Sequence, residues 1–119
     1  MNSLKEAERA GIVKRLKQNK KYWVIIFYSG DRIEDVAYAQ DFASVLKEAG
    51  WRVSGPEASA RLFPEGLRVG VQDPRDPCPS ASLLVDILTA VGIDAKAAPA
   101  ADFLSPGSPI NCCLLLGQS

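Results

Sequence analysis

Two short polar segments carry the side chains of this chain that are best suited to chemistry. Ser29-Gly30-Asp31-Arg32 follows an apolar run, and residues 72–80 read QDPRDPCPS. Hydroxyl, carboxylate and guanidinium groups that share a crevice bind small polar ligands, and an aspartate there can act as an acid or a base. The candidate ligand-binding residues are Ser29, Gly30, Asp31, Arg32, Asp73, Arg75, Asp76 and Ser80.

The same segments also have structural interpretations. Asp31 is a favourable N-cap for a following helix, and it puts a negative charge where a phosphate would bind. The prolines of residues 72–80 stiffen a turn whose aspartates accept local backbone hydrogen bonds. The chain has neither a G-x-G-x-x-G loop nor the lysine–serine/threonine pair of a P-loop. We therefore assign no catalytic residue and keep ligand binding as the hypothesis for these segments.

The chain contains no histidine, which excludes several kinds of site. Ser-His-Asp and Cys-His activation, histidine acid–base catalysis and most zinc sites need an imidazole. The three cysteines, Cys78, Cys112 and Cys113, lack the spacing of a metal site, and adjacent cysteines of a strand point to opposite faces. Cys78 precedes a helix, where a thiolate is stabilised, but without a histidine we expect a structural thiol. We expect no metal, no cofactor and a reducing compartment.

The formal net charge is zero, from fourteen basic and fourteen acidic side chains. Nucleic-acid binders usually carry a basic excess, so we expect no nucleic-acid partner. A local basic cluster consists of Lys14, Arg15, Lys17, Lys20 and Lys21. It suits the negative end of a helix dipole or, alternatively, a segment that lies near anionic lipid or another acidic surface. Neutral net charge also favours self-association, so a homo-oligomer is a further expectation.

Apolar periodicity and turn residues predict the elements that position these segments. Helices are expected over residues 3–19, 31–49 and 79–91, and strands over 22–28, 51–53, 67–71, 93–97 and 111–116. No stretch approaches the roughly 20 apolar residues of a membrane span. The 119 residues fit an N-terminal helix or linker over 1–21 and a single α/β domain over 22–119.

An internal repeat organises the α/β domain. FASVLKEAGWRVSGP aligns with LLVDILTAVGIDAKAAP, so that Gly50 matches Gly92 and both are expected to cap the C-terminus of a helix. Each half is then a strand–helix–strand unit with a right-handed crossover. We expect a three-layer α/β sandwich that resembles flavodoxin-like and Rossmann-like folds, with a parallel sheet in the strand order 2-1-3-4-5. Its topological switch point would bring residues 29–32 beside residues 72–80.

From residue 22 onward the chain resembles a known family. The motifs that carry the resemblance are SGD at 29–31, AGW at 49–51, GLRVGV at 66–71, the proline-containing loop that follows, and the final apolar strand before a glycine. They are similar to the soluble C-terminal domain of small bacterial inner-membrane proteins of uncharacterised function, in which membrane helices and a charged helical linker precede the domain. The resemblance implies that the basic N-terminal helix matches that linker, and that membrane contact would come through a missing segment or through this helix. The chain departs from the pattern in its lack of a membrane helix and of a terminal lysine–proline pair.

Together these features predict a non-enzymatic sensory or interaction domain in the cytoplasm, or the cytosolic part of a membrane-anchored protein. It would bind a small ligand or a protein partner at the switch-point crevice. One alternative is an enzyme that acts on a nucleotide or nucleoside, with Asp31, Asp73 or Asp76 as the acid or base. Another alternative is a structural module that self-associates.

Overall fold

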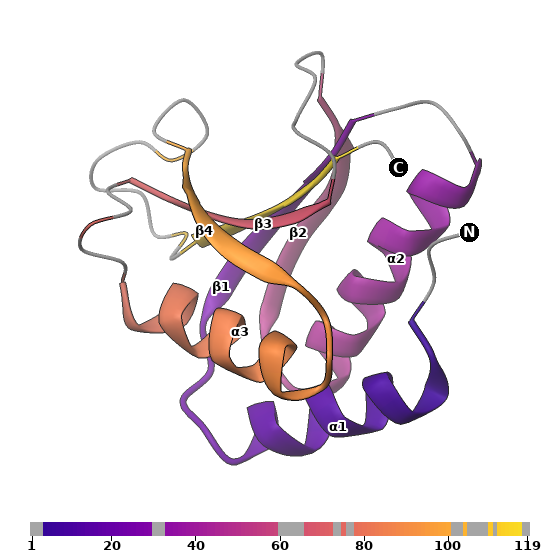
Figure 1. Ribbon diagram of the computed structural model, residues 1–119, viewed down its shortest axis with the longest axis vertical. Helices are drawn as coiled ribbons and strands as arrows, with labels where there is room; N and C mark the ends of the chain where they lie inside the picture. Colours follow the sequence, from indigo (N-terminus) through magenta and orange to yellow (C-terminus); the bar gives the residue numbers. More distant parts are fainter. Residues whose placement is uncertain are drawn as a thin grey trace.

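The computed structural model describes residues 4–29, 33–59, 66–72, 75, 78–100, 104, 110 and 112–117. Helices and strands lie close to their predicted positions along these residues (Figure 1). The elements are α1 (Glu6–Lys17), β1 (Trp23–Tyr28), α2 (Ile33–Glu48), β2 (Arg52–Ala58), β3 (Leu67–Val71), α3 (Pro79–Ala90), β4 (Ala95–Pro99) and β5 (Cys112–Leu116).

β2, which lies at the edge of the sheet, is longer than predicted. The predicted strand, 51–53, stops before Gly55, which has a φ of 88°, and Pro56. Pairing with β1 instead resumes at Glu57, after a register shift between Ile25 and Phe27. Proline has no N–H to donate. It is tolerated at a bulge or on an edge strand, because an edge strand forms hydrogen bonds with a neighbouring strand on only one of its two sides.

The sheet is mixed, with the strand order β2-β1-β5-β3-β4. β1 pairs in parallel with β2 and β5, and β3 pairs in parallel with β4, but β3 and β5 are antiparallel. The predicted parallel sheet of order 2-1-3-4-5 is therefore wrong. All residues of β5, CCLLL, are buried. A continuous apolar run of this kind is stable in the middle of a sheet, where both of its faces are covered, and β5 accordingly lies between β1 and β3.

All three helices of the described residues lie on the same side of the sheet (Figure 1): α2 and α3 pack on the strands, and α1 packs against α2 and α3. The main core fills the space between them and includes Val24 of β1 and Leu114 of β5. A second, smaller core on the other face is formed by Ala100, Leu104, Cys113 and Leu115. None of these four residues belongs to a helix. The described residues therefore form helices on one side of the sheet, and the second helical layer that the predicted three-layer sandwich requires is not found among them.

The direction of the second strand–helix–strand unit explains the single helical layer. The units β1-α2-β2 and β3-α3-β4 extend outward on opposite sides of β5. Two right-handed units that ran in the same direction would have to place their helices on opposite faces. Here the second unit runs opposite to the first. The two units are therefore related by a half-turn about an axis that passes through β5 perpendicular to the sheet. Such a half-turn reverses the strand direction and keeps both helices on the same face.

The repeated helix ends are confirmed. Gly50 and Gly92 have φ values of 93° and 90°, a region that glycine adopts without a steric penalty. The N–H groups of Trp51 and Ile93 donate hydrogen bonds of 3.0 and 2.8 Å to carbonyls five residues earlier. Both side chains are buried. This is the Schellman arrangement with its apolar contact, and it occurs once in each unit.

α1 is packed into the main core. Ile12 and Leu16 are buried there. Gly11 allows a close approach to α3, because a Cβ at this position would lie 2.9 Å from Cγ1 of Val91. The division into segments 1–21 and 22–119 stays a prediction. Within the part of the chain that is described, no helix is both long enough and apolar enough to cross a membrane.

Candidate functional site

Ser29, Arg75 and Ser80 are the predicted site residues that the structure describes. Ser29 follows β1 and Ser80 lies in the first turn of α3, and each is 1% exposed. Arg75 is exposed. The other predicted site residues lie outside the described residues; they are Gly30, Asp31, Arg32, Asp73 and Asp76.

The topology separates the two segments that were expected to share a crevice. The N–H of Ser29 donates to the carbonyl of Leu116 at 3.0 Å, so the chain leaves β1 beside the end of β5. Gly70 pairs with Cys113, so the chain leaves β3 near the start of β5. Because β1 and β3 run in opposite directions, Ser29 lies beside the end of β5 and Ser80 beside its start, at opposite ends of the strands. The predicted crevice between residues 29–32 and 72–80 is therefore wrong as a single site.

Ser80 belongs instead to a group of thiols at the start of α3. Its Oγ lies 3.2 Å from Sγ of Cys78, and it also forms a hydrogen bond with the thiol of Cys112. Burial raises the pKa of Cys112 to about 12, and burial raises the pKa of Cys113 to about 12 as well. Both are therefore protonated thiols at neutral pH.

A groove of about 440 Å³ lies between α1 and the end of α2, and we call it the α1–α2 groove. Its lining consists of Glu6, Arg9, Ala10, Val13, Lys14 and Lys17 of α1 and Glu48 of α2. The α1 residues recur at spacings of three and four, which places them along one side of that helix. The volume lies within the range of roughly 300–1,000 Å³ that is typical of ligand sites.

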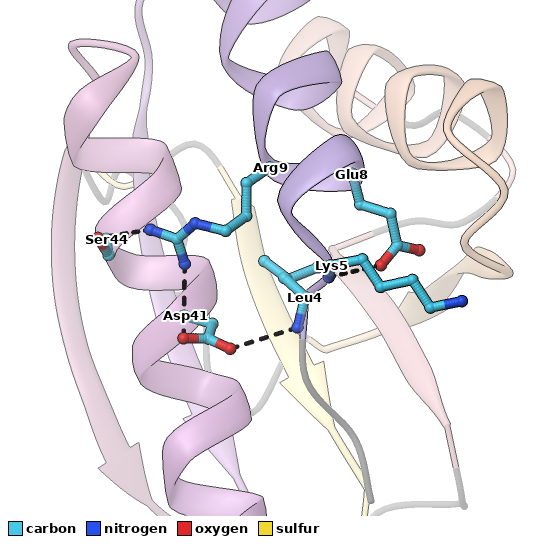
Figure 2. A network of polar contacts seen from close by, with 6 residues as sticks. All are labelled: Leu4, Lys5, Glu8, Arg9, Asp41 and Ser44. Atoms are coloured by element: carbon cyan, nitrogen blue, oxygen red, sulfur yellow. Dashed lines mark hydrogen bonds and ion pairs between the residues drawn. The ribbon is translucent and has the colours of Figure 1, made fainter.

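A polar network holds α1 against α2 beside this groove (Figure 2). Nη1 of Arg9 lies 3.5 Å from Oδ1 of Asp41, and Nη2 of Arg9 donates to Oγ of Ser44 at 3.3 Å. Oδ2 of Asp41 accepts a 3.3 Å hydrogen bond from the backbone N–H of Leu4. Arg9 is thus tied to α2, and its charge is partly neutralised before any ligand binds.

Lys14 and Lys17 supply the remaining positive charge of the groove. Both are exposed, and neither forms an ion pair with a described residue. Other members of the basic cluster have structural roles. Nη1 of Arg15 donates to the carbonyl of Gly11 at 3.2 Å, and Nζ of Lys21 contacts three carbonyls at the end of α1 at 3.2–3.3 Å. The interpretation of the cluster as a partner of the helix dipole is confirmed for Lys21.

A smaller hollow of about 180 Å³ lies at the end of the sheet where β5 ends and β3 begins. Its lining includes the side chains of Tyr38 and Asp94. Burial, then the charges of Glu8 and Asp41, raise the pKa of Tyr38, so its phenol is a hydrogen-bond donor at neutral pH. The hollow holds the volume of roughly six water molecules, which is less than ordinary ligand sites offer. The α1–α2 groove is therefore the better candidate site.

Sequence reasoning identified the groove lysines as basic residues but did not identify Arg9, Val13 or Glu48 as their neighbours. The spacing of Arg9, Val13 and Lys17 on a predicted helix was a usable signal that they share a side. Nothing in the local pattern indicates that the end of α2 closes the groove, because that contact joins residues far apart in the chain.

Among the described residues, no group of three or more cysteine, aspartate or glutamate side chains is placed to hold a metal ion. The resemblance to the C-terminal domain of bacterial inner-membrane proteins stays a prediction. Comparisons with protein-family models, with curated proteins and with solved structures find no match for this chain.

Proposed function

We propose that this chain is a non-enzymatic binding module whose α1–α2 groove holds an acidic segment of a partner protein. The observation that carries this proposal is the exposure of Lys14 and Lys17 at the groove, with no ion pair to a described residue. Carboxylates of a ligand would form charge-assisted hydrogen bonds with these ammonium groups, which are stronger than hydrogen bonds between neutral groups.

The lining of the groove favours a polypeptide over a free anion. Glu6 and Glu48 line the groove together with the cations, and their carboxylates would repel a phosphate or sulfate ion. A peptide carries acidic side chains that can pair with the lysines. It also carries backbone N–H groups, which can donate hydrogen bonds to the carboxylates of Glu6 and Glu48. Ala10 and Val13 add apolar contact area for the aliphatic parts of such a segment.

The groove is built on rigid elements, which lowers the cost of binding. Leu16 is fully buried in the main core, and Arg9 and Asp41 join α1 to α2. A ligand that enters a preformed groove loses less free energy to the ordering of protein side chains than one that must organise its site.

Titration of the isotope-labelled chain with a glutamate-rich peptide, followed by NMR, tests the proposal. We expect the shift changes to be confined to α1 and the end of α2, and the affinity to fall as salt is added. The double variant Lys14→Gln/Lys17→Gln should bind about 5- to 30-fold more weakly, because it loses two exposed charge pairs worth up to about 1 kcal/mol each.

The matched control is Arg75→Gln/Lys96→Gln, which removes the same charge from exposed positions outside α1 and outside the groove lining. Its affinity should stay within about twofold of the original, since distant surface charges are screened. Equal weakening by both variants contradicts the proposal, as does an absence of shift changes at low salt. Preferential binding to vesicles of phosphatidylcholine and phosphatidylserine would assign the lysines to a membrane surface instead.

A further inference from the structure

Cys78 and Cys112 are far apart in the sequence and close together in the fold. Cys78 is the residue before α3, and Cys112 is the first residue of β5. Sγ of Cys78 lies 3.2 Å from Oγ of Ser80, and the same hydroxyl forms a hydrogen bond with the thiol of Cys112. Both sulfurs therefore lie near one hydroxyl group, and Cys78 packs against the core cluster that contains Cys112.

The two thiols differ in their access to solvent. Cys78 is partly exposed, whereas Cys112 is 0% exposed. Cys112 lies under the first turn of α3, whose Ser80 and Ala81 are also buried. A dissolved oxidant therefore meets Cys78 first.

Cys113 is separated from this pair by the sheet. It belongs to the second core together with Ala100 and Leu115, and its Sγ packs directly on Gly70. Consecutive residues of a strand point to opposite faces, so the neighbour of Cys112 in the sequence cannot take its place. Cys113 is thus an internal control for any reaction of the pair.

We propose that Cys78 and Cys112 form an oxidation site that closes to a disulfide when the chain meets a peroxide. Sγ of Cys78 attacks one peroxide oxygen and the O–O bond breaks, which gives a sulfenic acid on Cys78 and one water. Sγ of Cys112 then bonds to Sγ of Cys78 and displaces the hydroxyl, which leaves with the Cys112 proton as a second water. Two electrons pass from the thiols to the peroxide. Ser80 contacts both sulfurs and is positioned to pass on that proton.

Oxidation of the reduced, full chain with hydrogen peroxide tests this site. The oxidised chain is then unfolded so that the buried Cys113 becomes accessible, remaining thiols are blocked with N-ethylmaleimide, and the product is analysed by intact mass and peptide mapping. We expect a product that has lost two hydrogen atoms and carries one maleimide, on Cys113, with Cys78 and Cys112 joined. The same treatment in urea should give a mixture of pairs, because the fold no longer selects one.

Three variants separate the proposed pair from general thiol oxidation. Cys78→Ser, a change at a partly exposed position, should abolish the linked product while circular dichroism shows an intact fold. Cys113→Ser should form the disulfide at the rate of the original chain, and Ser80→Ala should form it several-fold more slowly. A sulfinic acid on Cys78 with Cys112 still reduced, a bond to Cys113, or a link between two chains would each overturn the proposal.

Discussion

Side chains of one type have different roles in this chain because their surroundings differ. Lys21 closes the end of α1 through three carbonyls, whereas Lys14 lies exposed at the α1–α2 groove. The cysteines divide in the same way. Cys112 and Cys113 are both fully buried, yet only Cys112 shares a hydroxyl with another thiol. Residue type indicates which chemistry is available, and the contacts decide which residue performs it.

The buried thiols predict a loss of stability at alkaline pH. Burial raises the pKa of Cys112 and Cys113 to about 12, from an ordinary value of about 9. Between these values the folded chain keeps protons that the unfolded chain has released, so the free energy of unfolding falls as pH rises from about 9 to 12. The fall is at most about 1.4 kcal/mol per pH unit for each thiol, and below this window the contribution is constant.

Urea denaturation of the reduced chain at several pH values measures this effect. Cys113→Ala should lower the slope of unfolding free energy against pH, because one of the two buried thiols is gone. Tyr38, whose pKa is raised chiefly by burial, adds to the fall at the upper end of the range. A slope that the variant leaves unchanged would count against burial of this thiol as the cause.

At the scale of elements, small residues determine how closely neighbouring strands approach each other and the segments packed on them. β3 carries Gly70 at the position that pairs with Cys113 of β5, on the face that Ala100 covers. A Cβ at Gly70 would overlap Sγ of Cys113 and lie 2.7 Å from Cβ of Ala100. The absence of a side chain at Gly70 is therefore what allows Cys113 to be fully buried.

Gly70→Ala should lower the free energy of unfolding by about 1–3 kcal/mol, because overpacking of a buried site forces its neighbours to shift. Urea denaturation measures the change. In the double variant Gly70→Ala/Cys113→Ala the overlap with Sγ is removed, so part of the loss should be recovered. Strictly additive losses would show that the two positions do not interact. Gly92→Ala is a useful comparison, since a Cβ there meets nothing within 4 Å and its cost of about 1 kcal/mol comes from the backbone alone.

At the scale of the whole molecule, β5 joins the two strand–helix–strand units. It pairs with β1 on one side and with β3 on the other, and these are the pairings between the two halves of the sheet. β2 and β4 form the outer edges. The most stable part of the fold should therefore be formed by the last strand of the chain, with the strands of the repeat arranged around it.

Amide hydrogen exchange tests this arrangement. The amides of β5 should exchange at least about tenfold more slowly than those of β2 and β4, because edge strands open locally without disruption of the centre. A parallel sheet of order 2-1-3-4-5 would place the last strand at an edge and predict fast exchange there. Slow exchange in β4 and fast exchange in β5 would contradict the observed strand order.

The sequence by itself determined the local elements. Helix and strand positions, the two glycine caps and the repeat that contains them all depend on residues close together in the chain, and their signals survive without knowledge of the rest. The absence of histidine and the basic cluster were equally visible. The continuous apolar run CCLLL was a further signal, because an edge strand would leave part of it in water.

Only the tertiary structure decided the direction of the second unit, the place of β5 and the neighbours of each candidate residue. The pattern of apolar residues in a buried strand is equally compatible with a parallel and with an antiparallel neighbour. The choice depends on the complete arrangement of the chain, which here buries both faces of β5 and places all three described helices on the same side of the sheet. In this arrangement Ser29 and Ser80 lie at opposite ends of the strands, and Cys78 lies near Cys112. Glu48 lines the same groove as Lys14 and Lys17. Contacts between distant segments are set by this global competition for burial, which no local pattern contains.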